Sequence, residues 1–177
     1  IKHEKIVVGY VGWCSYFKGI GDVIELSKRL DDDFEVRFYV SGLTKRNKGY
    51  ILKKNSKIKV FGFSKDMPSV YNNVDILVYP LKFSVSAITM PLVILEAMAS
   101  GCAVITTNHR NLKEIVGNAG ILVKPNDTEK MLKEINKLKD PKLRGFFGEK
   151  ARKRIIKNYD EQIMFKKYEE LYDEILS

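Results

Sequence analysis

Hydrophobic residues recur along this chain in two alternating patterns. Short runs rich in β-branched and aromatic residues are separated by longer stretches in which apolar residues recur every three or four positions. The first pattern is typical of β-strands and the second of amphipathic helices. The predicted strands are residues 6–12, 35–42, 57–63, 75–81, 102–107 and 119–124. The predicted helices are residues 19–30, 66–74, 91–100, 112–117, 127–138, 142–157 and 161–176.

This alternation of strands and helices predicts the fold class. Strands joined by helical segments favour a parallel sheet, and right-handed crossovers place helices on both of its faces. We therefore expect an α/β fold with a doubly wound, Rossmann-like parallel sheet of about six strands. Residues 43–56 follow neither pattern well and are predicted as a loop with a short helix. A length of 177 residues fits one domain, 1–177.

The predicted sheet also indicates where a ligand would bind. Ligands of doubly wound sheets lie outside the carboxyl ends of the strands, near the point where the strand order reverses. Helices that begin at this edge direct unpaired N–H groups toward the ligand, and this favours an anion such as a diphosphate. The loops concerned follow Gly12, Gly42, Phe63, Leu81 and Thr107.

Glu96 is the one carboxylate in the otherwise apolar helix predicted over residues 91–100. Such a helix is expected to be buried, and a buried carboxylate needs hydrogen-bond donors. Glu96 therefore either pairs with a backbone amide or a lysine across the sheet, or accepts hydrogen bonds from ligand hydroxyls.

Lys18 lies in the first strand-to-helix loop, between Gly12 and Gly19. A cation at the start of a helix opposes the helix dipole unless an anion lies between them. Lys18 is thus either an exposed lysine without a role or a phosphate ligand.

Other common chemistries have little support in the sequence. The glycines near the first strand do not form the GxGxxG pattern of a nicotinamide site. Cys14 and Cys102 have no metal-ligand or redox spacing, so we expect free thiols. His3 lies near the terminus, and His109 follows a predicted strand at the ligand edge, where it either contacts a ligand or has no role in binding.

The net charge of +9 allows a nucleic-acid surface, an anionic-membrane surface, or a lysine-rich surface with an anionic small ligand. Nucleic-acid binding has the least support because no recognised motif accompanies the charge. Residues 142–157 combine cations with the large apolar residues Phe146, Phe147, Ile155 and Ile156, among others. This stretch either packs against the sheet or contacts an anionic membrane.

Signals for export or membrane insertion are absent from the sequence. There is no signal peptide, and no apolar run approaches the length of a membrane span. We therefore expect a soluble cytoplasmic protein, either free or peripheral on the cytoplasmic face of the membrane. The chain begins at Ile1 with apolar alternation almost at once, so we expect it to be part of a longer polypeptide.

Several segments together resemble the group 1 (family four) glycosyltransferases. They are Lys18-Gly19, the run 57–63 that ends in Phe-Gly-Phe, the block Leu95-Glu96-Ala97-Met98-Ala99-Ser100-Gly101, and the segments 113–117 and 120–123. The resemblance covers nearly the whole chain. Members of this family have the GT-B architecture, in which two Rossmann-like domains face a cleft, and the chain is similar to the C-terminal, donor-binding half.

The resemblance implies a donor site and a reaction. Lys18 would bind the diphosphate, Glu96 the donor ribose, and the amides around Leu92 and Val93 the phosphates. The reaction would be transfer of a sugar from a UDP-sugar or GDP-sugar with retention of anomeric configuration, without a cofactor or a metal in this domain. The remaining expected donor-site residues are Gly12, Trp13, Gly19, Phe63 and Pro91.

Three positions depart from the family pattern. Trp13 stands in place of an arginine, Ile88 in place of the first glutamate, and Pro91, which lacks an N–H, in place of a glycine. Loss of the arginine and an amide would weaken donor binding about ten- to a hundredfold unless other groups replace them. Trp13 is expected to pack or to stack on a ligand ring. A non-catalytic nucleotide- or sugar-nucleotide-binding paralogue is therefore the alternative to an enzyme.

The resemblance also implies partners. An N-terminal acceptor domain of the same polypeptide would complete the cleft, and the terminal helix at about 161–176 would cross to it and leave apolar positions exposed here. The acceptor would be a sugar, a lipid or a polysaccharide. An isolated domain is expected to fold but to transfer no sugar.

Overall fold

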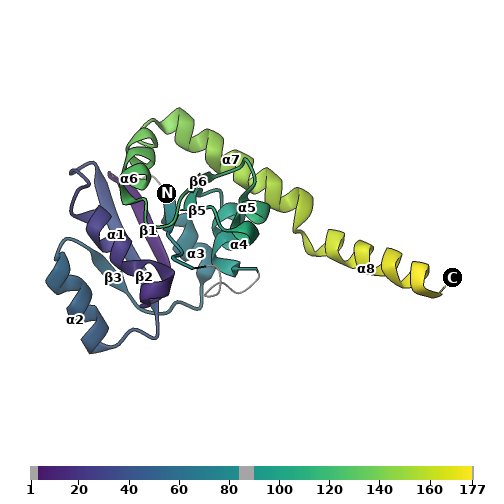
Figure 1. Ribbon diagram of the computed structural model, residues 1–177, viewed down its shortest axis with the longest axis horizontal. Helices are drawn as coiled ribbons and strands as arrows, with labels where there is room; N and C mark the ends of the chain where they lie inside the picture. The colour runs from purple at the N-terminus through teal and green to yellow at the C-terminus, as the bar shows by residue number, and fades with distance from the viewer. Residues whose placement is uncertain (1–3, 84–89, 177) are drawn as a thin grey trace.

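The computed structural model describes residues 4–83 and 90–176, and these form a six-stranded parallel sheet with helices on both faces (Figure 1). The strand order is β3-β2-β1-β4-β5-β6, and all neighbouring strands are parallel. The predicted doubly wound, Rossmann-like fold is confirmed. The strands are β1 (Ile6–Trp13), β2 (Phe34–Ser41), β3 (Lys59–Phe61), β4 (Ile76–Tyr79), β5 (Ala103–Thr107) and β6 (Ile121–Val123).

The helices divide between the two faces of the sheet. Two clusters of buried apolar residues lie on opposite faces: one contains residues of α1, α2 and α6, and the other contains residues of α3, α4, α5 and α7. Helix α7 also packs Leu143 and Phe147 against the first cluster. The helices are α1 (Ile20–Ser27), α2 (Lys45–Lys54), α3 (Met67–Asn72), α4 (Leu92–Ala99), α5 (Arg110–Val116), α6 (Thr128–Lys137), α7 (Pro141–Asn158) and α8 (Glu161–Leu176), with a 3-10 turn η1 (Tyr16–Lys18).

Alternation along β1 explains how one strand serves both clusters. Val8 and Tyr10 pack with α1, whereas Val7 and Val11 pack on the other side. Successive side chains of a strand point to opposite faces, so a strand covered on both sides is apolar throughout. All residues of β4 and β5 are accordingly buried.

Helix α2 is longer than the short helix predicted within residues 43–56. Thr44 forms a reciprocal capping box with Asn47, because its hydroxyl accepts from the Asn47 N–H at 3.2 Å and its own N–H donates to Asn47 Oδ1 at 2.7 Å. Ile51 is the one buried residue of α2. The cap stabilises a helix whose apolar face is too narrow to give a clear periodic signal.

Helix α7 is fixed tightly against the rest of the domain along one side. The Arg154 guanidinium donates to the carbonyl oxygens of Ile115 and Glu114, both at 2.7 Å, and so satisfies the last turn of α5. A Cβ atom on Gly148 would lie 2.2 Å from the carbonyl oxygen of Gly101, so the two backbones are in direct contact. Packing against the domain is thus one use of residues 142–157.

Helix α8 extends away from the body of the domain (Figure 1). It contains no buried residue, and its exposed apolar side chains recur at helical spacing. The expectation of exposed apolar positions in this helix is confirmed. These side chains are Met164, Phe165, Tyr168, Leu171, Tyr172, Ile175 and Leu176.

Removal of residues 161–177 is expected to leave the stability of the domain unchanged within about 0.5 kcal/mol, because α8 buries no residue. Thermal and urea denaturation of the shortened chain would test this. The matched control is removal of residues 151–177, which also deletes the buried Ala151 and Ile155 and should destabilise the domain strongly. A large loss of stability on removing α8 alone would contradict the observed exposure.

Candidate functional site

The strand order reverses between β1 and β4, the two neighbours at the centre of the sheet. The chain leaving β1 leads to α1 on one face, and the chain leaving β4 leads toward α4 on the other. Segments that diverge in this way leave a crevice at the carboxyl ends of the two strands, where ligands of such folds bind.

The loop after β1 is held against the end of β4. Residues 16–18 form a single 3-10 turn that ends at Gly19, whose φ is 74°. A Cβ atom at this position would lie 2.0 Å from the carbonyl oxygen of Pro80, so only glycine permits this approach. This contact places Lys18 beside the last residue of β4.

The Lys18 ammonium lies over the ring of Tyr79, 5.9 Å from its centroid. Lys18 is half-buried, and this burial lowers its pKa because the charged form is partly removed from water. Tyr79 is buried, and burial raises its pKa to about 12, so the ring remains uncharged at neutral pH. An anion bound here would offset the desolvation of Lys18.

Glu96 lies in the middle of α4 and is half-buried. The hydroxyl of Tyr71, on α3, donates to its Oε2 atom at 2.8 Å. Burial and this hydrogen bond raise the pKa of Tyr71 far above its ordinary value, so Tyr71 is a permanent donor. The two predicted structural partners, a backbone amide and a lysine, are replaced here by a tyrosine hydroxyl.

Two buried tyrosines lie between Lys18 and Glu96. Tyr79, under the Lys18 ammonium, and Tyr71, which donates to Glu96, belong to the same cluster of buried residues on one face of the sheet. The cation at the β1 loop and the carboxylate on α4 therefore belong to one neighbourhood at the switch point. The sequence predicted both residues but not the tyrosines that they contact.

The start of α4 adds backbone donors at this edge. Pro91 is buried at the N-cap and provides no side-chain cap, and Leu92 and Val93 form the first turn. The N–H groups of a first turn have no acceptor within the helix. Ile88, the position of the family's first glutamate, lies outside the described residues, and its role stays a prediction.

Exposed aromatic residues follow the carboxyl ends of several strands. Phe63, after β3, is 72% exposed, and Trp13, at the end of β1, is also exposed. The Trp13 ring nevertheless packs on Gly42, where a Cβ atom would lie 2.6 Å from it. Phe17 forms edge contacts with Tyr16 at 5.8 Å and with Phe83 at 6.0 Å between ring centroids. Apolar exposure of this extent is typical of a ligand or protein contact.

Lys82 is a residue of this edge that the sequence did not indicate. Its ammonium lies 2.8 Å from Asp22 Oδ1, 3.0 Å from Asn126 Oδ1, and 4.9 Å from the centroid of the Tyr16 ring. The side chains of Lys82 and Asp22 are only 9% and 15% exposed. Its backbone N–H also donates to the carbonyl of Phe17 at 3.1 Å. Lys82 thus fixes the loops after β1 and β6 to the end of β4.

The contacts of His109 and the two cysteines are those of structural residues. His109 Nε2 lies 3.0 Å from the carbonyl oxygen of Leu81, which also accepts from the Thr107 hydroxyl at 2.8 Å. Cys14 and Cys102 are free, as predicted. Cys102 is buried, and burial raises its pKa to about 12, so it is not a thiolate at neutral pH.

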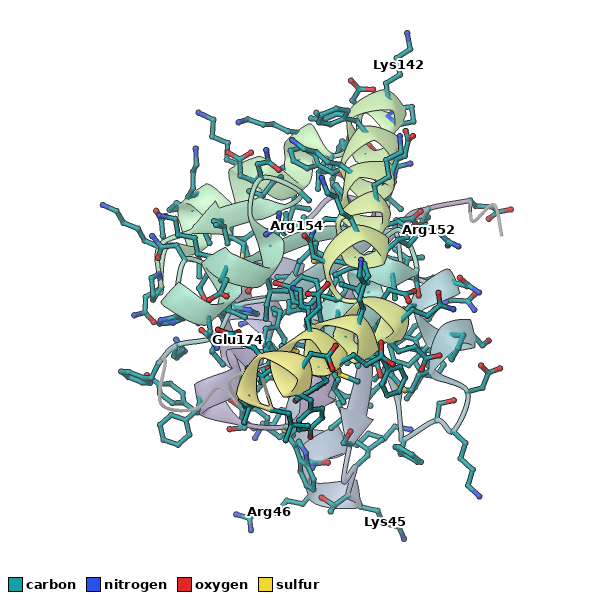
Figure 2. The ribbon with its side chains drawn as sticks, turned by 90° about the vertical axis from the view of Figure 1, so that its right-hand side faces the viewer. Lys45, Arg46, Lys142, Arg152, Arg154 and Glu174 are labelled. Atoms are coloured by element: carbon teal, nitrogen blue, oxygen red, sulfur yellow. The ribbon has the colours of Figure 1, made fainter. Side chains whose placement is uncertain are left out.

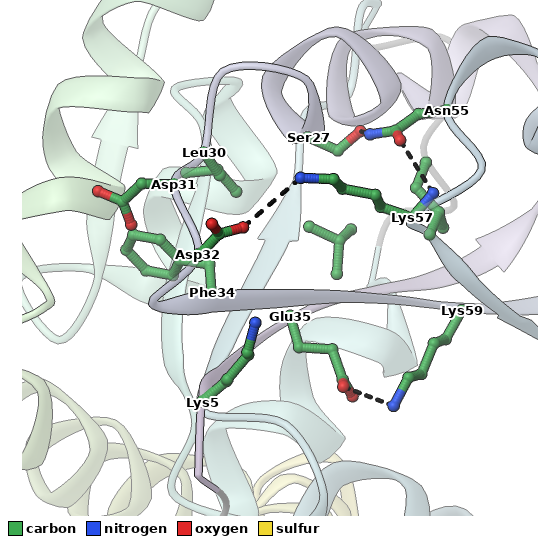
Figure 3. A pocket seen from close by; sticks show the side chains of 12 residues that line it. Lys5, Ser27, Leu30, Asp31, Asp32, Phe34, Glu35, Asn55, Lys57 and Lys59 are labelled. Atoms are coloured by element: carbon green, nitrogen blue, oxygen red, sulfur yellow. Dashed lines mark hydrogen bonds and ion pairs between the residues drawn. The ribbon is translucent and has the colours of Figure 1, made fainter.

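A cavity of about 290 Å³ lies at the opposite edge, near the starts of β2 and β3 (Figure 3). Its charged groups neutralise one another, for example Lys57 with Asp32 at 3.5 Å and Lys59 with Glu35 at 2.5 Å. A shallower hollow of about 380 Å³ lies beside Phe63 at the carboxyl end of β3. We place the candidate site at the switch point, because the loop with Lys18 follows β1 and the helix with Glu96 follows β4, the two strands between which the order reverses.

Comparison with known sequences relates the chain to sugar transfer. The family model described as glycosyl transferases group 1 matches residues 5–140. The chain is 28% identical over 184 aligned positions to the capsular polysaccharide biosynthesis glycosyltransferase CapM of Staphylococcus aureus. That alignment covers 98% of this chain and 47% of CapM, so the chain spans about half the length of this relative.

Solved structures share the fold over similar extents. A glycosyltransferase from Rickettsia africae superposes with a TM-score of 0.85 at 22% identity, covering 99% of this chain and 49% of that one. Anabaena HepE in complex with UDP-glucose superposes with a TM-score of 0.80 at 18% identity, covering 96% and 49%. At these identities the similarity concerns the fold, which is half of a GT-B architecture.

Proposed function

The chain belongs to the group 1 glycosyltransferases, and on this premise we propose that it is the donor-binding half of a retaining transferase. The donor would be a UDP-sugar or a GDP-sugar, bound at the switch point between β1 and β4 without a cofactor or a metal. The UDP-glucose complex of HepE, which has a similar fold, supports a nucleotide-sugar ligand. The acceptor would be a sugar, a lipid or a polysaccharide.

The observation that carries the proposal is the position of Lys18 over Tyr79 and of Glu96 on Tyr71, two tyrosines of one buried cluster. A nucleotide sugar carries a diphosphate between its ribose and its sugar, so it needs a cation and hydroxyl acceptors within one ligand's length. Lys18 would bind the diphosphate, and Glu96, oriented by Tyr71, would accept from the ribose hydroxyls.

The remaining contacts follow from the loops around this pair. The first-turn amides of Leu92 and Val93 would hydrogen-bond to the phosphates, and the base would lie toward Phe63 and the hollow beside it. Gly12 and Gly19 would allow the β1 loop to approach the ligand. In this arrangement Trp13, where the family has an arginine, leaves Lys18 as the main cation at the diphosphate.

We further propose that an N-terminal acceptor domain of the same polypeptide covers the exposed aromatic residues and receives α8. The chain spans about half of CapM, and the apolar side of α8 is exposed, so both observations agree with a second half. Transfer would require both halves, because the closed cleft positions the acceptor and excludes water. Sugar-transfer assays of the longer polypeptide and of residues 1–177 would test this, because only the longer polypeptide should transfer sugar.

A second candidate function is a binding module without transferase activity. The replacement of the usual arginine by Trp13 and of the first glutamate by Ile88 favours it. Both candidates expect nucleotide binding, so the assay that separates them is sugar transfer or donor hydrolysis by the longer polypeptide. Tight donor binding without turnover would favour the module.

Substitution of Glu96 by glutamine is expected to weaken UDP or GDP binding about ten- to a hundredfold, because a neutral amide replaces a charged acceptor for two hydroxyls. The fold should be retained, since the glutamine carbonyl still accepts from Tyr71. Titration calorimetry gives the affinity, and thermal denaturation gives the stability.

The matched control is Glu149→Gln, at an exposed carboxylate on α7, which should change neither quantity. Lys18→Ala should weaken diphosphates more than nucleosides. Unchanged nucleotide affinity for Glu96→Gln together with a sharply lower melting temperature would make Glu96 a structural partner of Tyr71 and refute the donor-site assignment.

A further inference from the structure

The two sides of α7 differ in chemistry. The inner side contains the buried residues Gly148, Ala151 and Ile155. Helical spacing places a different set on the side that faces away from the sheet, which we call the outer face of α7. Its residues are Lys142, Phe146, Glu149, Lys150, Arg152, Lys153, Ile156 and Lys157.

The outer face is strongly basic. It carries five cations and one carboxylate, Glu149, which is paired with Lys153 at 2.5 Å. Arg154, by contrast, leaves α7 on a different side from Arg152 and is used inside the domain to cap α5 (Figure 2). The cations of the outer face are thus directed away from the packed interface of the helix.

Two large apolar side chains lie among these cations. Phe146 and Ile156 are both 55% exposed, and they are separated by about 15 Å along the helix. The Lys150 ammonium lies 5.4 Å from the centroid of the Phe146 ring. The other apolar residues of α7 do not face outward, because Ala151 and Ile155 are buried and Leu143 and Phe147 are half-buried.

We propose that the outer face of α7 binds an anionic lipid surface. Lysine and arginine side chains are attracted to anionic headgroups, and exposed phenylalanine and isoleucine side chains insert between them. A nucleic acid would satisfy the cations but would leave the two apolar residues in water. No helix in the described part of the chain is long and apolar enough to cross a bilayer, and the proposed contact needs none.

Cosedimentation of the 177-residue chain with phospholipid vesicles tests the proposal. The chain should bind vesicles that contain phosphatidylglycerol but not vesicles of phosphatidylcholine alone. Binding should fall when the salt concentration is raised from about 0.05 M to about 0.5 M, because salt screens the charges. Absence of binding to phosphatidylglycerol vesicles at low salt would overturn the proposal.

Two sets of variants locate the contact. The triple variant Lys142→Glu, Arg152→Glu and Lys157→Glu should lower the partition coefficient roughly tenfold or more. A control with the same change of net charge is Lys45→Glu, Arg46→Glu and Lys48→Glu on α2, where Lys45 and Arg46 project at the opposite end of the molecule from Lys142 (Figure 2). The control should lose little binding. Equal losses would show attraction by total charge and refute the assignment to α7.

A third variant separates insertion from simple charge attraction. Phe146→Ser with Ile156→Ser keeps every charge and should still weaken vesicle binding severalfold. An unchanged partition coefficient, or RNA binding that depends on the same cations, would refute lipid insertion. Calorimetry with UDP on each variant reports on the donor site separately, so failure of this proposal is distinguishable from failure of the proposed function.

Discussion

Substitution of Gly19 by alanine is expected to destabilise the domain by about 2–5 kcal/mol. The left-handed backbone conformation, φ 74°, costs an alanine about 1–2 kcal/mol, and relief of the contact with the Pro80 carbonyl oxygen costs about 1–3 kcal/mol more. The contact is between backbones, so no side-chain rotation can relieve it. Urea denaturation of the variant and the parent chain gives the free energy of unfolding.

Gly21 provides a control two residues away. It lies inside α1, and a Cβ atom there would meet nothing within 4 Å. Gly21→Ala should therefore be neutral or stabilise the domain by up to about 1 kcal/mol, because alanine favours the helix. If Gly19→Ala cost less than about 1 kcal/mol, the loop after β1 would not be fixed to the end of β4 as described.

Substitution of Lys82 by methionine is expected to cost about 3–5 kcal/mol, because it leaves the carboxylate of Asp22 buried without its cation. The variant also removes the hydrogen bond to Asn126 and the contact with the Tyr16 ring. Equilibrium unfolding in urea measures the loss. Nucleotide affinity should fall in the same variant, since the turn that holds Lys18 loses its support.

A double variant tests whether the loss comes from the unpaired carboxylate. Lys82→Met combined with Asp22→Leu replaces both charges and should recover most of the stability. Lys28→Met removes a cation from the more exposed pair that Lys28 forms with Glu25, and it should cost less than about 1 kcal/mol. Equal losses for Lys82→Met and Lys28→Met would show that burial of the Lys82 pair has no energetic consequence.

The local pattern of apolar and polar residues is sufficient to predict most of the fold. The central strands are covered by helices on both faces, so they appear in the sequence as continuous apolar runs. Each predicted strand overlaps an observed one. The full length of helix α2 does not follow from the pattern, because its stability depends on the Thr44 cap and on one buried residue, Ile51. Neither feature produces a repeating apolar signal.

The local sequence pattern predicts some residues of the candidate site but not the residues that they contact. Lys18 and Glu96 can be picked out from the sequence because each is unusual in its helix: Lys18 is a cation at a helix start, and Glu96 is a carboxylate in an apolar helix. The contacts that form this edge join residues far apart in sequence: Tyr71 is 25 residues from Glu96, and Asp22 is 60 residues from Lys82. Such pairs arise from the tertiary arrangement of α3, α4 and the β1 loop.

Because α8 buries no residue, the fraction of it that is helical can change with its surroundings. A 16-residue helix that buries none of its residues depends largely on its internal hydrogen bonds and on pairs such as Lys166 with Glu170, 3.8 Å apart. Helices of this length lie near the midpoint of the helix–coil transition in water. Docking on a second domain would shift that transition toward helix, and the conformational entropy lost would be subtracted from the docking free energy. In the proposed two-domain transferase, such coupled folding would keep the contact between α8 and the second domain reversible.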